Sequence, residues 1–192
     1  MAGKWGNKGG RRVARGVTLV ETMVTASLAA VIMGIAVPSM VAMQHRQAVA
    51  AETASFRQGV HRARSEALRR GETVTLCALA PESVPTGEPQ CLESGRDWST
   101  GWLVFIDRGN TGIREVDDPV LMVHLQRAAA GSVAATVKAL TFHAQGFSSN
   151  AASHFRFVPP GAAPDSRGVP GSLLVCVNKP GRVRQTEADD CA

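Results

Sequence analysis

Two arginines near the C-terminal end of the chain have the spacing that would let them bind an anion. Arg182 and Arg184 are two residues apart, Gly181 precedes them, and Lys179 lies just before that turn. On a strand, residues two apart project from one face about 6.6 Å from each other. Such a pair can contact successive phosphates through charge-assisted hydrogen bonds without reading a base sequence. The alternative is a basic edge strand that resists unwanted pairing, or that bridges to acidic groups of neighbouring subunits.

The sequence contains none of the enzyme motifs HExxH, GxSxG or the phosphate-binding loop. Five histidines are scattered without the spacing of metal ligands: His45, His61, His124, His143 and His154. Asp107, Asn110 and Glu115 lack the spacing of a calcium loop, and a hairpin turn accounts for the asparagine and the nearby glycines. We therefore expect no catalytic residue, no metal and no cofactor.

Four cysteines predict disulfides, provided that the protein is exported to an oxidising compartment. Four cysteines allow three pairings. We expect Cys77 to pair with Cys91, closing a proline-rich loop, and Cys176 to pair with Cys191, tying the C-terminus to the preceding strand. A four-cysteine zinc site requires close CxxC pairs, which the sequence lacks.

Length and composition indicate one folded domain with an appended segment. The chain has 192 residues, of which 44% are hydrophobic and 19% charged. Its formal charge of +5 lies entirely in the first 16 residues, which hold five basic residues and no acidic one. Because the remainder is formally neutral, its net charge gives no argument for nucleic-acid binding.

An apolar run from Val17 to Met43 is long enough to cross a bilayer. It is longer than the apolar region of a secretory signal, and the basic residues before it favour a cytoplasmic N-terminus with an exported body. Glu21 is its only charged residue. A carboxylate there costs several kcal/mol unless it is paired or reaches the interface. We therefore expect Glu21 to have a partner.

The helix is expected to continue through residues 44–71, followed by a β-rich body at 72–192. Apolar residues recur at spacings of three and four until Ala67, and Gly71 then supplies the position that ends a helix. Beyond Gly71 the pattern alternates, which predicts strands. Six or seven strands are expected: ETVTLCAL, WLVFID, VLMVHLQ, VKALTFHA, HFRFV, SLLVCV and RVRQ. Closely spaced strands without helices between them imply antiparallel pairing and an α+β fold.

The start of the apolar run resembles the type IV prepilin signal, with Gly16, Val17 and Glu21 at the characteristic positions. The resemblance implies that 1–16 is a leader removed between Gly16 and Val17, and that the new N-terminal amine is methylated. It also implies that Glu21 meets the N-terminal amine of a neighbouring subunit during filament assembly, with 17–43 as the membrane and filament-core helix. The implied partners are a prepilin peptidase/methyltransferase, other pilin subunits and the bacterial inner membrane. Most relatives have phenylalanine or methionine in place of Val17.

The body resembles the GspH/FimT group of minor pilins and pseudopilins, which implies a type IV pilin-like fold. The resemblance is carried by DWSTGWLVFIDRGNTGIRE, by LTFHAQGF and by LLVCVNKPGRVR. The GRxR segment resembles the DNA-binding motif of FimT-type minor pilins, which serve DNA uptake in natural transformation. This implies binding of double-stranded DNA by Lys179, Gly181, Arg182 and Arg184, on a protein that passes from the inner membrane and periplasm to a surface pilus. Two other roles stay open: a structural minor pilin that initiates assembly, or a pseudopilin of type II secretion.

Three basic residues neutralise only a few phosphates, so a single copy is expected to bind DNA weakly and without sequence preference. Useful affinity would require Arg57, Arg62 or Arg64 close to the motif, or several copies in one filament. The chain has 3 Trp, 6 Phe and no Tyr, which gives little support for stacking on bases.

Overall fold

A computed structural model describes residues 16–150 and 152–191 of the chain. The chain divides into two compact units, Met1–Val41 and Ala42–Ala192. A single helix, α1 (Leu19–Arg70), contributes to both units, and every strand belongs to the second. The leader expected at 1–16 lies, apart from Gly16, outside the described residues.

The first unit is the apolar part of α1. Thr18 caps the helix, since its side-chain Oγ1 accepts a hydrogen bond from the Glu21 amide at 3.3 Å. An 18-residue window of the helix has a mean hydropathy of 2.0, and none of that window is buried. Its length and composition suit a bilayer, and the hydroxyl of Thr22 is satisfied within the helix by the carbonyl of Leu19 at 2.7 Å. This surface therefore needs apolar surroundings from outside the chain.

The second part of α1 packs on the body through one apolar stripe. Its fully buried members recur at helical spacing: Val49, Phe56, Val60, Ala63 and Ala67. The helix ends at Arg70, as predicted, because Gly71 adopts a φ of 69° and donates its amide to the carbonyl of Ala67 at 3.0 Å.

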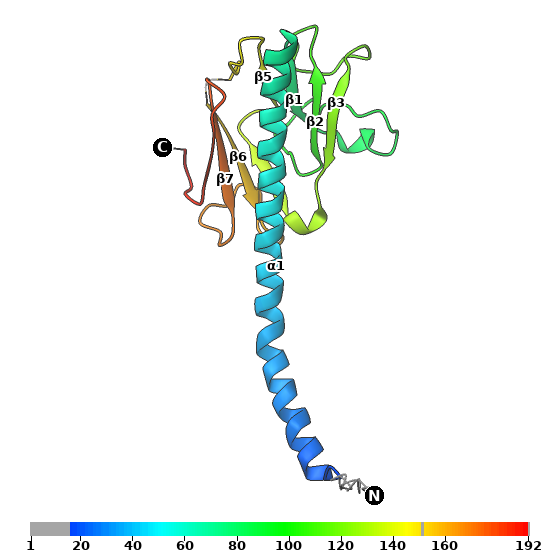
Figure 1. Ribbon diagram of the computed structural model, residues 1–192, viewed down its shortest axis with the longest axis vertical. Coiled ribbons are helices and arrows are strands. Elements are labelled where there is room, and N and C mark those ends of the chain that lie inside the picture. Colours follow the sequence, from blue (N-terminus) through cyan, green and yellow to red (C-terminus); the bar gives the residue numbers. More distant parts are fainter. Residues whose placement is uncertain (1–15, 151, 192) are drawn as a thin grey trace, which may run out of the picture. The chain divides into compact units, whose positions relative to one another are not determined.

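Two four-stranded antiparallel sheets complete the body, which confirms the α+β prediction. The first sheet has the order β3-β2-β1-β5 and the second the order β4-β6-β7-β8. The strands of the first sheet are β1 (Val74–Ala78), β2 (Gly101–Ile106), β3 (Val120–Leu125) and β5 (Ala139–Phe142). Those of the second are β4 (Ser132–Ala135), β6 (Ala152–Val158), β7 (Leu173–Asn178) and β8 (Val183–Thr186). Within this unit the helix runs along both sheets, with β1–β3 on one side and β6–β7 on the other (Figure 1).

The sequence prediction of six or seven strands was wrong by omission, because the described residues form eight. The missed strand is β4, whose residues SVAA are too short and too small to show a clear alternation. The segment is nevertheless a strand, because the backbone of other segments hydrogen-bonds to it on both sides. On one edge it pairs with β6, and on the other the Trp98 amide donates to the carbonyl of Val133 at 2.8 Å.

The hydrophobic core centres on Phe56 of α1, which joins the helix to both sheets. Its ring lies 5.3 Å from that of Trp102 on β2 and 4.4 Å from that of Phe155 on β6. It also contacts Trp98 at 5.8 Å and Phe157 at 5.6 Å. The described core residues and both disulfides all fall after residue 48, so residues 42–192 contain what an independently folding domain requires.

Candidate functional site: a basic hairpin on the second sheet

The predicted anion-binding residues lie on the hairpin that joins β7 to β8. In the turn, Gly181 adopts a φ of 78° and donates its amide to the carbonyl of Asn178 at 2.8 Å. The Asn178 side chain accepts the amide of Arg182 at 2.8 Å, and the Asn178 amide donates to the Arg182 carbonyl at 3.1 Å. Arg182 therefore extends the ladder by one pair although it precedes β8. Asn178 shapes this turn, as Asn commonly does, and this role was not among the predictions from the sequence.

Lys179, Arg182 and Arg184 are exposed, and we call this group the basic hairpin. Val183, between the two arginines, packs against the hydrophobic core. Side chains alternate along a strand, so Arg182 and Arg184 share the opposite, outer face of the second sheet. Because β8 is the last strand of that sheet, the basic hairpin lies at a sheet edge. Arg182 and Arg184 therefore project from one face, as their spacing of two residues predicted.

Two arginines of α1 donate hydrogen bonds to the turn and strand that carry the basic hairpin. Arg64 donates to the carbonyl of Gly146 at 3.1 Å and to that of Gly181 at 3.4 Å. Arg57 donates to the side-chain carbonyl of Gln185 on β8 at 3.3 Å. These two guanidinium groups bond to the protein itself, so their main effect is on position, whereas Arg62 is exposed.

A groove of about 430 Å³ borders the basic hairpin on the outer face. Its lining includes His154, Arg182, Arg184 and the Cys176–Cys191 disulfide. Burial lowers the pKa of His154, and the positive charges of Arg156 and Arg167 lower it further. The imidazole is therefore neutral at pH 7, and the positive charge of the groove comes from the arginines.

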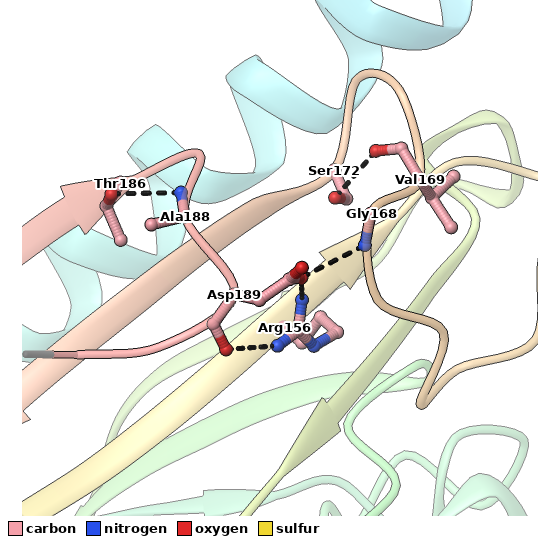
Figure 2. A network of polar contacts seen from close by, with 7 residues as sticks. All are labelled: Arg156, Gly168, Val169, Ser172, Thr186, Ala188 and Asp189. Carbon is pink, nitrogen blue, oxygen red and sulfur yellow. Dashed lines mark hydrogen bonds and ion pairs between the residues drawn. The ribbon is translucent and has the colours of Figure 1, made fainter.

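The C-terminal segment crosses the same outer face and is bonded to it (Figure 2). Arg156, on β6, donates from Nη1 to Asp189 Oδ1 and from Nη2 to the Asp189 carbonyl, both at 2.8 Å. The Gly168 amide donates to the same Asp189 Oδ1 at 3.1 Å. These contacts lower the pKa of Asp189, the Gly168 hydrogen bond most of all and the Arg156 guanidinium next, so its carboxylate is ionised well below neutral pH.

The structure contains the two disulfides that the sequence predicted. Cys77 is bonded to Cys91 with a Cα–Cα distance of 5.6 Å, and Cys176 is bonded to Cys191 with a distance of 5.8 Å. The first closes the loop after β1. The second attaches the C-terminal segment to β7, directly beside the groove.

Asp107 serves the turn after β2. Its carboxylate accepts the Thr75 hydroxyl at 2.8 Å and the amides of Thr111 and Gly112 at 3.0 and 2.9 Å. Asp107 as a residue is 1% exposed, and these donors compensate for the burial of its carboxylate. Within residues 16–150 and 152–191, no cluster of three His, Cys, Asp or Glu side chains could hold a metal ion.

The residues expected to take part in processing and assembly belong to the first unit. Gly16 and Val17 precede α1 and are exposed, and Glu21 is exposed in the first helical turn. A carboxylate there interacts favourably with the helix dipole. Cleavage after Gly16, methylation of Val17 and pairing of Glu21 with a neighbouring subunit stay predictions.

Arg156 and Asp189, which bind the C-terminal segment to the sheet, were not predicted from the sequence. A signal for Arg156 existed, since in HFRFV it lies between Phe155 and Phe157, and alternation places it on the face opposite the core. Nothing local indicates Asp189 as its partner, because 33 positions separate the two.

These features define a class of protein. An apolar helix of membrane-spanning length that continues into an amphipathic half, packed on antiparallel sheets, is the architecture of type IV pilins and pseudopilins. Residues 52–185, more than half of the chain, match the family described as type II transport protein GspH. The chain belongs to this family.

Solved structures with a similar fold come from Pseudomonas aeruginosa. Its type IV minor pilin FimU, in one crystal form, is 18% identical with a TM-score of 0.52, over 75% of this chain and 92% of that chain. A second crystal form of FimU is 16% identical with a TM-score of 0.48, over 71% of this chain and 90% of that chain. No curated protein sequence matches this chain. The first of these likenesses agrees with the pilin fold.

Proposed function

We propose that this protein is a minor pilin that binds the backbone of double-stranded DNA through its basic hairpin, for uptake in natural transformation. It is made as a prepilin, cleaved after Gly16 and assembled through the apolar half of α1 with other pilin subunits. The observation that carries the DNA assignment is the placement of Arg182 and Arg184, exposed on one face at a sheet edge, with Lys179 in the turn.

The basic hairpin is suited to recognition of the DNA backbone rather than of the bases. Arg182 and Arg184 are two residues apart, and each guanidinium can donate to a phosphate oxygen. The hairpin is held by Arg64, which bonds to the Gly181 carbonyl, so little ordering is needed on binding. The described residues that line the groove include no Phe or Trp on which bases could stack, which favours binding without sequence preference.

A single copy should bind weakly, with a shallow dependence on salt. Three phosphate contacts give a slope of log K against log salt of about −2.7 on duplex DNA. Several copies in one filament would raise the effective affinity without any new contact.

The test uses residues 42–192 with both disulfides formed, in a DNA shift or anisotropy assay at several salt concentrations. The parent is compared with Arg182→Ala/Arg184→Ala. A matched control, Arg96→Ala/Arg127→Ala, removes two exposed arginines elsewhere and changes the net charge equally. We expect the hairpin variant to lose at least tenfold in affinity, with a slope shallower by about two, and the control to stay within about twofold.

Equal binding by parent and hairpin variant would remove DNA binding from these arginines. Loss of pili on deletion of the protein, together with that result, would favour a structural minor pilin that initiates assembly.

Processing has its own test, on full-length protein recovered from cells with an active prepilin peptidase. We expect an N-terminus at Val17 with a methylated amine. Recovery of the chain with Met1 still attached would contradict the assembly mechanism.

The family match favours a second candidate, since the matched family is described as a type II transport protein. In that role the chain is a pseudopilin, and its body contacts secreted proteins or other subunits. A deletion strain that loses secretion but keeps its pili and its transformation would establish this function instead.

A further inference from the structure

The segment after β8 is a strap of acidic residues that lies over the face carrying the basic hairpin. We call residues Glu187–Cys191 the acidic strap. Glu187, Asp189 and Asp190 are all exposed, and they are the acidic residues closest in sequence to the basic hairpin. The disulfide from Cys191 to Cys176 of β7 holds the end of the strap on the sheet.

The strap is also held by an anion-binding arrangement at Arg156. Both terminal nitrogens of Arg156 donate to Asp189, and the Gly168 amide donates to the same carboxylate oxygen (Figure 2). Arg156 is 8% exposed, so its guanidinium is fixed in place rather than free in solvent. A buried guanidinium together with a backbone N–H is also a set of donors suited to a phosphate oxygen.

The strand register places Arg156 on the same face as the basic hairpin. Across the second sheet, Cys176 lies opposite Arg184 and His154, and Leu174 lies opposite Thr186 and Arg156. Arg156, Arg184 and Arg182 therefore follow one another on the outer face. Asp189 lies on this face, where it bonds to Arg156, and Glu187 and Asp190 are close to it in the chain. The negative charge of these three residues reduces the attraction of this face for a polyanion.

Resting on the function proposed above, we propose that the acidic strap masks an extended phosphate-binding face. Arg156 and the Gly168 amide form an anion subsite beyond the basic hairpin. The Asp189 carboxylate fills this subsite in the free protein, and a DNA phosphate takes its place when the strap is displaced. The strap thereby sets a low affinity for DNA, and its displacement adds one phosphate contact to those of the hairpin.

The experiment neutralises the strap without shortening it, in residues 42–192 with both disulfides intact. The strap variant is Glu187→Gln/Asp189→Asn/Asp190→Asn. Its matched control is Glu82→Gln/Glu88→Gln/Glu93→Gln, which changes the net charge equally at exposed positions of the loop after β1. A third protein adds Arg156→Gln to the strap variant. Binding of one duplex DNA is measured at several salt concentrations, and thermal unfolding is measured for every variant.

We expect the strap variant to bind about tenfold more tightly, because each acidic charge removed within a Debye length of the phosphates contributes about twofold. Its salt slope should steepen by about one, the value for one added phosphate contact. The Arg156→Gln addition should remove that extra slope, and the loop control should stay within about twofold of the parent. Tight binding by the strap variant where the parent binds no DNA would support the proposal as well.

The results that overturn the proposal are separable from failure of the DNA function. Equal gains in the strap variant and the loop control would show an effect of net charge alone. A parent that binds DNA beside a strap variant with no gain would refute the mask and leave the basic hairpin as the site. A gain that persists unchanged with Arg156→Gln would refute the subsite. Absence of binding in both parent and strap variant would refute the DNA function and the mask together.

Discussion

Replacing Phe56 with alanine tests whether the helix is joined to both sheets through one aromatic contact. Truncating a fully buried phenylalanine costs about 3–5 kcal/mol of unfolding free energy, from lost transfer and a cavity. Phe56 has no exposed surface, and the centroids of four aromatic rings lie 4.4 to 5.8 Å from its own. Each such pair contributes about 0.5–1.5 kcal/mol beyond burial. We therefore expect a loss of about 4–5 kcal/mol, a large part of the stability of a domain this size.

The assay is urea unfolding of residues 42–192, followed by tryptophan fluorescence. This unit contains two tryptophans, Trp98 and Trp102, and both contact Phe56, so the signal reports on the contact itself. The control is Phe147→Ala, a phenylalanine that is 53% exposed, for which we expect a loss of about 1 kcal/mol. A loss below about 2 kcal/mol for Phe56→Ala, or equal losses for the two variants, would refute the assignment of Phe56 as the joint.

Three further predictions concern charges and a turn. Glu52 of α1 is 2% exposed, and its Oε1 lies 2.5 Å from Nε2 of His124. Because His124→Ala leaves this buried carboxylate unpaired, we expect it to lower the free energy of unfolding in urea by about 3 kcal/mol. The double variant Glu52→Gln/His124→Ala should lose less than His124→Ala alone. Gly181→Ala should destabilise the body by about 1–2 kcal/mol, because φ is 78° and the added carbon would lie 3.0 Å from the Arg64 side chain. Gly161→Ala, also at positive φ but in open space, should cost less. Equal costs would show that the contact with Arg64 is unimportant. Because the pKa of Asp189 is lowered, its contacts should persist at pH 5 and be lost only as the pH falls below the ordinary pKa of an aspartate. NMR titration of the Asp189 carboxyl carbon measures this, and a titration midpoint above pH 4 would contradict it.

Local patterns predicted the elements whose residues carry their own signal. The spacing of apolar residues up to Ala67, followed by Gly71, predicted the end of α1 at Arg70. The spacing of two residues on a strand predicted that Arg182 and Arg184 share a face, and the packing of Val183 against the core agrees with this. β4 was missed because SVAA carries no such signal, and its pairing with β6 and with the segment at Trp98 depends on distant parts of the chain.

Local patterns were enough to predict an apolar helix with one acid, a β-rich body with four cysteines, and a pair of arginines on one strand face. These follow from periodicity and charge, which act over a few residues. The surroundings of those arginines, in contrast, come from distant parts of the chain. Arg64 reaches the Gly181 carbonyl, and Arg156 reaches Asp189, across separations of 117 and 33 residues. Such contacts depend on how the sheets and helix pack together, since a donor can pair with any acceptor that the fold brings within about 3 Å.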